Sequence, residues 1–67
     1  MNKDFIYKHL KDRITGPTSF EDIYAIFERM GIGAIEVQES LDELEKEGKL
    51  VKTRMDRYGI PEQMNLL

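Results

Sequence analysis

Apolar residues recur at helical spacing in three stretches of this chain, and after Gly48 the spacing changes to alternation. In residues 3–14, Ile6, Leu10 and Ile14 lie four positions apart, which places them on one stripe of a helix. A chain of 67 residues without Cys has room for one small core and no disulfide framework. The pattern therefore predicts a single, mainly helical domain.

The second predicted helix has a clear start signal. Gly16 and Pro17 end the first helix, and Thr18 is expected to begin a short extended segment. Ser19 is then the predicted N-cap, with Asp22 three residues later as in a capping box. The predicted buried face of this helix consists of Ile23, Ile26, Phe27 and Met30.

The third predicted helix covers about residues 34–47 and follows a turn at residues 31–33. Its apolar line is Val37, Leu41 and Leu44. Gly48 stands where a left-handed C-cap is expected.

The alternation after Gly48 predicts an antiparallel hairpin. If Met55 and Asp56 form a two-residue loop, Thr53 faces Tyr58 and Val51 faces Ile60, and these four side chains point toward the core. Met-Asp is not a favoured pair for such a loop, and a longer loop would shift the register. The order of elements predicts a mainly α winged helix, with a three-helix bundle and a small antiparallel β-hairpin as the wing. Residues 1–67 are expected to be one such domain from a longer, multidomain protein.

Positive charge is concentrated on the predicted hairpin. The net charge is -3, yet residues 48–61 carry +3, while residues 1–18 carry +2, residues 19–47 carry -7 and Glu62 adds the last negative charge. The predicted outer face of the hairpin holds Lys52, Arg54 and Arg57, with Arg54 directly across from Arg57. Because like charges paired across strands are unfavourable, stability alone does not select this pair. Lys49, Lys52, Arg54 and Arg57 are therefore the candidate phosphate contacts, and a solvated face that protects a sheet edge is the alternative.

The other candidate groups offer weaker chemistry. Lys8 and Lys11 could extend the basic patch, whereas the predicted register points Tyr58 inward, away from base stacking. His9 has no catalytic partner motif, and the Asp residues are too scattered to hold metal ions. The third helix carries many carboxylates, so it would be repelled by a DNA groove and would suit a partner with a basic surface. No apolar run is long enough to span a membrane, and a cytoplasmic location is expected.

The segments LEKEGKLVKTR and DRYGIPEQMNL, at residues 44–54 and 56–66, closely resemble the end of the N-terminal winged-helix domain of bacterial ribonuclease R. The matching positions are Glu45, Gly48, Leu50, Val51, Lys52, Thr53, Arg54, Arg57, Tyr58, Gly59, Ile60, Pro61, Glu62, Met64, Asn65 and Leu66. Residues 1–43 resemble that family only in their pattern of helices.

The resemblance implies an accessory, helix-turn-helix domain of a 3'-5' exoribonuclease, a hydrolase that degrades RNA. This chain itself would then have no catalytic residue, no metal and no cofactor, while Mg²⁺ would act in another domain of the enzyme. Lys49, Lys52, Arg54 and Arg57 would bind RNA phosphates through weak, salt-sensitive contacts. The alternative is a protein-interaction module that uses the acidic third helix to bind other domains of its own protein or a protein with a basic surface.

Overall fold

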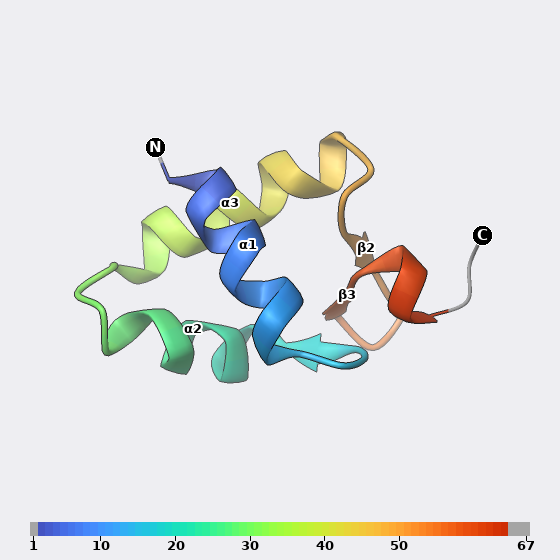
Figure 1. The fold of residues 1–67 in the computed structure, drawn as a ribbon, viewed down its shortest axis with the longest axis horizontal. Coiled ribbons are helices and arrows are strands. Elements are labelled where there is room, and N and C mark those ends of the chain that lie inside the picture. The colour runs from blue at the N-terminus through green and yellow to red at the C-terminus, as the bar shows by residue number, and fades with distance from the viewer. Residues whose placement is uncertain (1, 65–67) are drawn as a thin grey trace.

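The computed structural model of the chain describes residues 2–64 and contains three α-helices, three short strands and a final 3-10 helix (Figure 1). In chain order the elements are α1 (Lys3–Arg13), β1 (Thr18–Ser19), α2 (Phe20–Glu28), α3 (Ala34–Lys46), β2 (Val51–Lys52), β3 (Arg57–Gly59) and η1 (Pro61–Met64). The three helices pack together, and the sheet and η1 lie beside them. Asn65 and Leu66, which end the ribonuclease-like segment, lie outside the described residues.

The start of α2 and the end of α3 lie where their sequence signals place them. Ser19 caps α2, because its hydroxyl accepts a hydrogen bond from the backbone N–H of Asp22 at 3.2 Å. Gly48 follows α3 with a φ of +77°, the left-handed conformation that glycine adopts without steric cost. Both predictions are confirmed.

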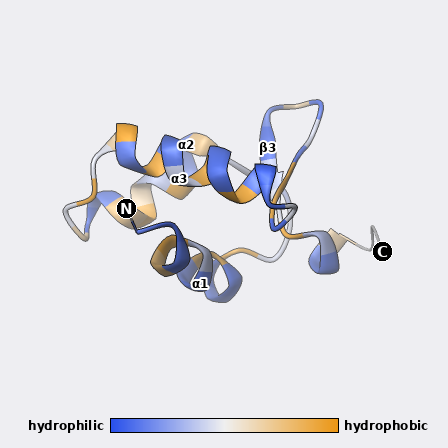
Figure 2. Cartoon of the chain, turned by 90° about the horizontal axis from the view of Figure 1, so that it is seen from above, coloured by the Kyte–Doolittle hydropathy of each residue, from blue (hydrophilic) through white to orange (hydrophobic). Residues whose placement is uncertain are grey.

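The core consists of the apolar stripes of the three helices, closed by side chains of the hairpin. Figure 2 shows how apolar and polar residues alternate along the helices. Its buried members are Ile6, Leu10, Ile14, Ile23, Phe27, Val37, Leu41, Leu44, Leu50, Tyr58 and Ile60. The predicted stripes of the first and third helices are therefore confirmed. On α2, Ile26 is only half-buried, and the prediction for Met30 is wrong, because the helix ends at Glu28 and leaves Met30 38% exposed.

The sheet has three antiparallel strands in the order β1-β3-β2, where the sequence predicted a two-stranded hairpin. Thr18 pairs with Tyr58 and brings β1 onto the free side of β3. The chain is thus a mainly helical small domain with a small antiparallel sheet, and the winged-helix assignment stays a prediction.

The predicted register of the hairpin is wrong by one residue. Val51 pairs with Gly59 and Lys52 pairs with Tyr58, whereas the prediction set Val51 against Ile60. Because side chains alternate along a strand, a slip of one residue exchanges the two faces. Leu50 therefore closes the core, while Val51 and Thr53 are only half-buried.

The loop between β2 and β3 explains this difference. Thr53 donates its N–H to the carbonyl oxygen of Arg57 at 2.7 Å, and Asp56 donates its N–H to the carbonyl oxygen of Thr53 at 3.0 Å. Asp56 has a φ of +58°, so the loop has three residues with a left-handed third position rather than two residues. The Thr53 hydroxyl accepts from the N–H groups of Met55 and Arg57, both at 3.2 Å, and stabilises the turn.

Among the described residues, the helices are all too short or too polar to cross a lipid bilayer.

Candidate functional site

Two surfaces carry the charged side chains that could bind a partner, the hairpin and the outer face of α3. The four hairpin cations do not form the single outer face that the sequence predicted. Lys49 lies in the turn after α3, with its Nζ 3.6 Å from Glu47 Oε1 and 5.4 Å from the centre of the Tyr7 ring. Lys49 is thereby directed toward α1 and its charge is compensated by a neighbouring carboxylate.

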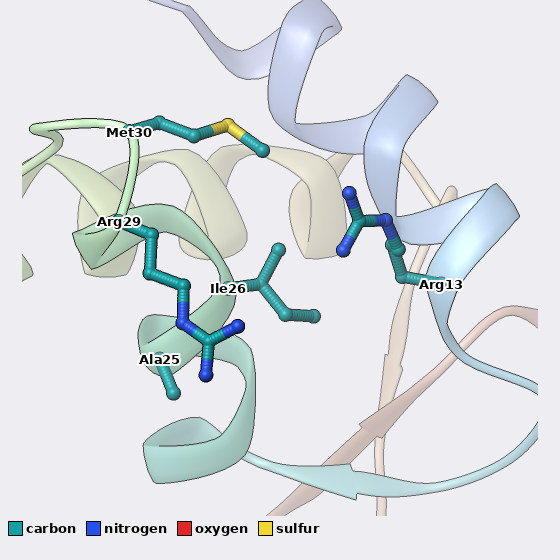
Figure 3. Close-up of a pocket in the computed structure, with 5 residues that line it drawn as sticks. All are labelled: Arg13, Ala25, Ile26, Arg29 and Met30. Carbon is teal, nitrogen blue, oxygen red and sulfur yellow. The ribbon is translucent and has the colours of Figure 1, made fainter.

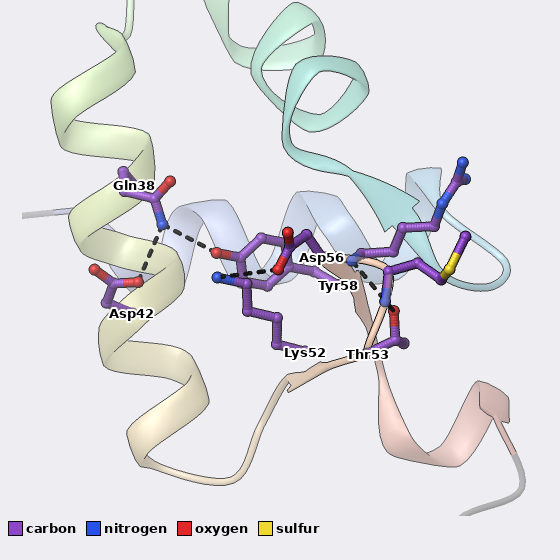
Figure 4. Close-up of polar contacts among 8 residues, drawn as sticks. Gln38, Asp42, Lys52, Thr53, Asp56 and Tyr58 are labelled. Atoms are coloured by element: carbon purple, nitrogen blue, oxygen red, sulfur yellow. Dashed lines mark hydrogen bonds and ion pairs between the residues drawn. The ribbon is translucent and has the colours of Figure 1, made fainter.

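Lys52 shares the core side of the hairpin with Tyr58 because the two residues are paired across the strands. Its stem follows the ring, and its Nζ lies 5.6 Å from the ring centre and 3.9 Å from Asp56 Oδ1 (Figure 4). The prediction that Lys52 shares an outer face with Arg54 and Arg57 is wrong, because the one-residue shift of register places Lys52 opposite Tyr58. Lys52 is therefore a second cation that already has a carboxylate partner.

Arg54 and Arg57 are the hairpin cations that remain available. Both are exposed, and neither forms an ion pair within residues 2–64. The prediction that they face each other across the strands is wrong, since Thr53 occupies the position bonded to Arg57 and Arg54 lies in the loop. This placement removes the expected like-charge pair. Their role in nucleic-acid binding, like that of Lys49 and Lys52, stays a prediction.

Tyr58 is a core residue, as the sequence predicted, and it links the sheet to α3. The side chain is 2% exposed, so its ring cannot stack on a nucleic-acid base. Its hydroxyl accepts a hydrogen bond from Gln38 Nε2 at 3.0 Å, and the same nitrogen donates to Asp42 Oδ1 at 3.0 Å (Figure 4). Sequence reasoning missed Gln38, although its spacing of four residues from Asp42 is a recognised pairing on a helix.

One flank of α3 is held to α1 by an ion pair that spans 44 positions in the sequence. Lys3 Nζ donates a hydrogen bond to Glu47 and lies 3.7 Å from Glu43 Oε2. The hydrogen bond from Lys3 lowers the pKa of Glu47, and the same bond raises the pKa of Lys3. Nearby, Asn2 donates to Glu36 Oε2 at 3.2 Å. This flank therefore supports the fold and leaves little charge for a partner.

The outward side of α3 is the second candidate surface. We define the acidic face of α3 as Glu39, Asp42 and Glu43 with the neighbouring Ile35, since positions 39, 42 and 43 lie four, seven and eight residues after Ile35 and share one side of the helix. The three carboxylates are exposed, and Ile35 is 77% exposed. Within the part of the chain that the structure describes, Glu39 and Asp42 form no ion pair. At Glu39 and Asp42 this face therefore presents uncompensated negative charge next to an exposed apolar side chain, while Glu43, at its edge, lies 3.7 Å from Lys3 Nζ.

The remaining candidates from the sequence occupy packing positions on α1. Lys11 Nζ lies 4.9 Å from the centre of the Tyr7 ring, so Tyr7 contacts both Lys11 and Lys49, whereas Lys8 does not join them. His9 Nδ1 lies 3.1 Å from the carbonyl oxygen of Phe5, and the two rings are 4.2 Å apart. His9 thus packs against Phe5 of its own helix and lies edge-on to Phe27 of α2, with ring centres 6.3 Å apart, which agrees with the expectation of a packing or surface residue. Over residues 2–64, no group of three His, Cys, Asp or Glu side chains gathers where a metal ion could bind.

The comparisons with known proteins gave one match. The family model for sigma-70 factor, region 1.1, matches residues 4–58, which include α2, α3 and all but the first residue of α1 and reach into β3. No curated protein and no solved structure matched the chain.

This match overturns the resemblance to ribonuclease R and the RNA-degrading role that it implied. The ribonuclease-like segment owes much of its pattern to the fold: Gly48 adopts a left-handed conformation, and Leu50, Tyr58 and Ile60 are buried. A Cβ on Gly59 would overlap the side chain of Met64, which would have to move to make room, so glycine suits this packing as well. Residues that a fold requires can recur in proteins of different function, and here they gave a wrong identification.

Proposed function

Because the chain belongs to the sigma-70 factor, region 1.1 family, we propose that it is an N-terminal regulatory domain of a sigma factor that acts by binding protein partners. It performs no catalysis and needs no cofactor of its own. It works in transcription, as one domain of a longer cytoplasmic protein. The order of elements supports a winged-helix arrangement, in which α2 and α3 form the helix-turn-helix and β2 and β3 form the wing.

The single observation that carries the proposal is the acidic face of α3. Glu39 and Asp42 present charges that no cation of the described chain compensates, and Ile35 adds an apolar contact beside them. A complementary surface has Lys or Arg side chains around an apolar spot, since interfaces combine charge complementarity with buried apolar contacts. RNA polymerase, or another domain of the same sigma factor, is the proposed partner.

The charge of α3 also supports a regulatory role. A duplex phosphate backbone is repelled by Glu39, Asp42 and Glu43, so α3 does not enter a DNA groove. Basic surfaces of transcription proteins attract the same phosphates, and α3 would compete with DNA for such a surface when it docks there. Docking of the acidic face would thereby hold DNA away until the domain moves.

The test is a binding measurement with purified RNA polymerase core enzyme and, in parallel, with the remaining regions of the sigma factor. Reversal of the three carboxylates, as Glu39→Lys, Asp42→Lys and Glu43→Lys, replaces attraction by repulsion. Because mutation of charges at an interface rim mainly lowers the association rate, biolayer interferometry at low and at physiological salt is the suitable readout. We expect the triple variant to lose measurable binding to the partner at both salt concentrations.

A matched control has the same change in net charge away from α3. It consists of Asp12→Lys, Glu28→Lys and Glu62→Lys, which change exposed residues that form no ion pair within the described residues. We expect this variant to keep binding within about threefold of the unchanged chain, because surface charges outside an interface contribute little. Equal loss in both variants would mean that net charge, and not the acidic face, controls the association, and the proposal would then fail.

A further inference from the structure

A pocket of about 250 Å³ lies between the C-terminal ends of α1 and α2, on a surface that includes no residue of α3 or the sheet. Its lining combines two cations with an apolar floor and consists of Arg13, Ala25, Ile26, Arg29 and Met30. Figure 3 shows the side chains of Arg13 and Arg29 on either side of Ile26, with Met30 reaching over the same floor. The pocket thus has an apolar centre between two guanidinium groups.

The two arginines are not used by the fold for ion pairing. Both are exposed, and neither has a carboxylate partner within residues 2–64. Their positions near the ends of α1 and α2 let them interact favourably with the helix dipoles, which accounts for the presence of positive charge. The dipoles do not account for the apolar floor, where Met30 is 38% exposed and Ile26 is half-buried.

The dimensions and chemistry of the pocket restrict its ligand. Its volume is below the roughly 300–1,000 Å³ of pockets for drug-sized molecules, so it suits one or two side chains. Arginine binds carboxylates through a planar fork of donors, and methionine adapts its shape to an apolar side chain. A nucleic acid fits poorly, because a polyanion needs a row of cations and the lining of this pocket offers two.

We propose that this pocket binds an acidic peptide segment of a protein partner, in which one apolar side chain lies between carboxylates. The apolar side chain packs on Ile26 and Met30, and the flanking carboxylates pair with Arg13 and Arg29. This surface is separate from the acidic face of α3, so the domain can bind a basic partner and an acidic partner at the same time.

The test is an NMR titration of the ¹⁵N-labelled chain with a synthetic peptide of sequence SDELDES, acetylated and amidated at its ends. We expect shifts of the backbone amides of Ile26, Arg29 and Met30. A neutral peptide, SNQLNQS, should bind about tenfold more weakly because it loses both charge contacts. A peptide without the apolar residue, SDESDES, should give no shifts at the pocket.

Protein variants complete the design. Arg13→Gln and Arg29→Gln should each weaken the binding of SDELDES about threefold, whereas Lys8→Gln on the same helix should leave it unchanged. The substitutions are at exposed positions, and circular dichroism verifies that each variant is folded. Binding of SDESDES or SNQLNQS as tight as that of SDELDES would overturn the proposal. So would shifts confined to the hairpin, or a short RNA that displaces SDELDES from this pocket.

Discussion

The substitution Tyr58→Phe tests the contact that joins the sheet to α3. It keeps the buried ring and removes only the hydroxyl that accepts a hydrogen bond from Gln38 Nε2 at 3.0 Å. One such bond contributes about 0.5–1.5 kcal/mol to stability. Gln38 retains its bond to Asp42 and is only half-buried, so water can satisfy the freed N–H. We therefore expect a loss of about 1 kcal/mol or slightly less.

That loss is large enough to measure in a domain of this size. A chain of 67 residues has a free energy of unfolding of roughly 3–10 kcal/mol, and 1 kcal/mol lowers its Tm by about 4–8 °C. Urea denaturation followed by far-UV circular dichroism gives the free energy directly. Tyr24→Phe is the matched control, because the structure gives the Tyr24 hydroxyl no hydrogen bond within the described residues and we expect no change. A Tyr58→Phe variant as stable as the unchanged chain would refute the account of this contact.

Three further predictions concern stability. Gly48→Ala should lower the free energy of unfolding, measured by urea denaturation, by about 1–2 kcal/mol, because the φ of +77° is unfavourable for alanine. A Cβ would meet no atom within 4 Å at Gly48 or at Gly16, so Gly16→Ala is the control and should leave stability unchanged. Leu41→Ala removes a fully buried side chain and should lower the free energy of unfolding by about 2–5 kcal/mol. In a thermal unfolding experiment, part of the protein should then already be unfolded at the starting temperature. The hydrogen bond from Lys3 lowers the pKa of Glu47, so the stabilisation by this bond should disappear as the pH falls from neutral to below the ordinary glutamate pKa of about 4.3. In the Lys3→Gln variant, the free energy of unfolding should change less with pH over this range.

The helices could be predicted from the sequence because their signals are local. The stripe of Ile6, Leu10 and Ile14 and the cap at Ser19 each depend on residues within one or two turns of helix. The C-cap at Gly48 could also be predicted from neighbouring residues alone, because this glycine directly follows a segment with helical apolar spacing.

The antiparallel hairpin was predicted, but its register and the charged contacts could not be, because they depend on distant residues or on exact loop geometry. Alternation alone fits both the predicted and the observed register, and the left-handed conformation of Asp56 decides between them. The short extended segment expected at Thr18 is present as β1, but two residues are too few for a pattern that would predict its pairing with β3. The pairing of Lys3 with Glu47 requires the packing of α1 on α3, which no local signal reports.

The identification failed for a related reason. The segment at residues 44–66 is a specific pattern, yet its glycines and buried side chains at Gly48, Leu50 and Tyr58 serve the fold. The family model spans residues 4–58 and so includes the helices before residue 44, which the motif does not cover. The acidic face of α3 was visible as a run of carboxylates, and the structure adds which of them remain without a cation.

The central claim is that the domain meets its protein partner through the acidic face of α3. The most direct measurement is an NMR titration of the ¹⁵N-labelled chain with unlabelled RNA polymerase core enzyme, in which residues at the contact lose signal first. We predict early loss at Ile35, Glu39, Asp42 and Glu43, and later loss at Arg54 in the hairpin loop. Early loss confined to the hairpin, with the α3 signals retained, would contradict the claim.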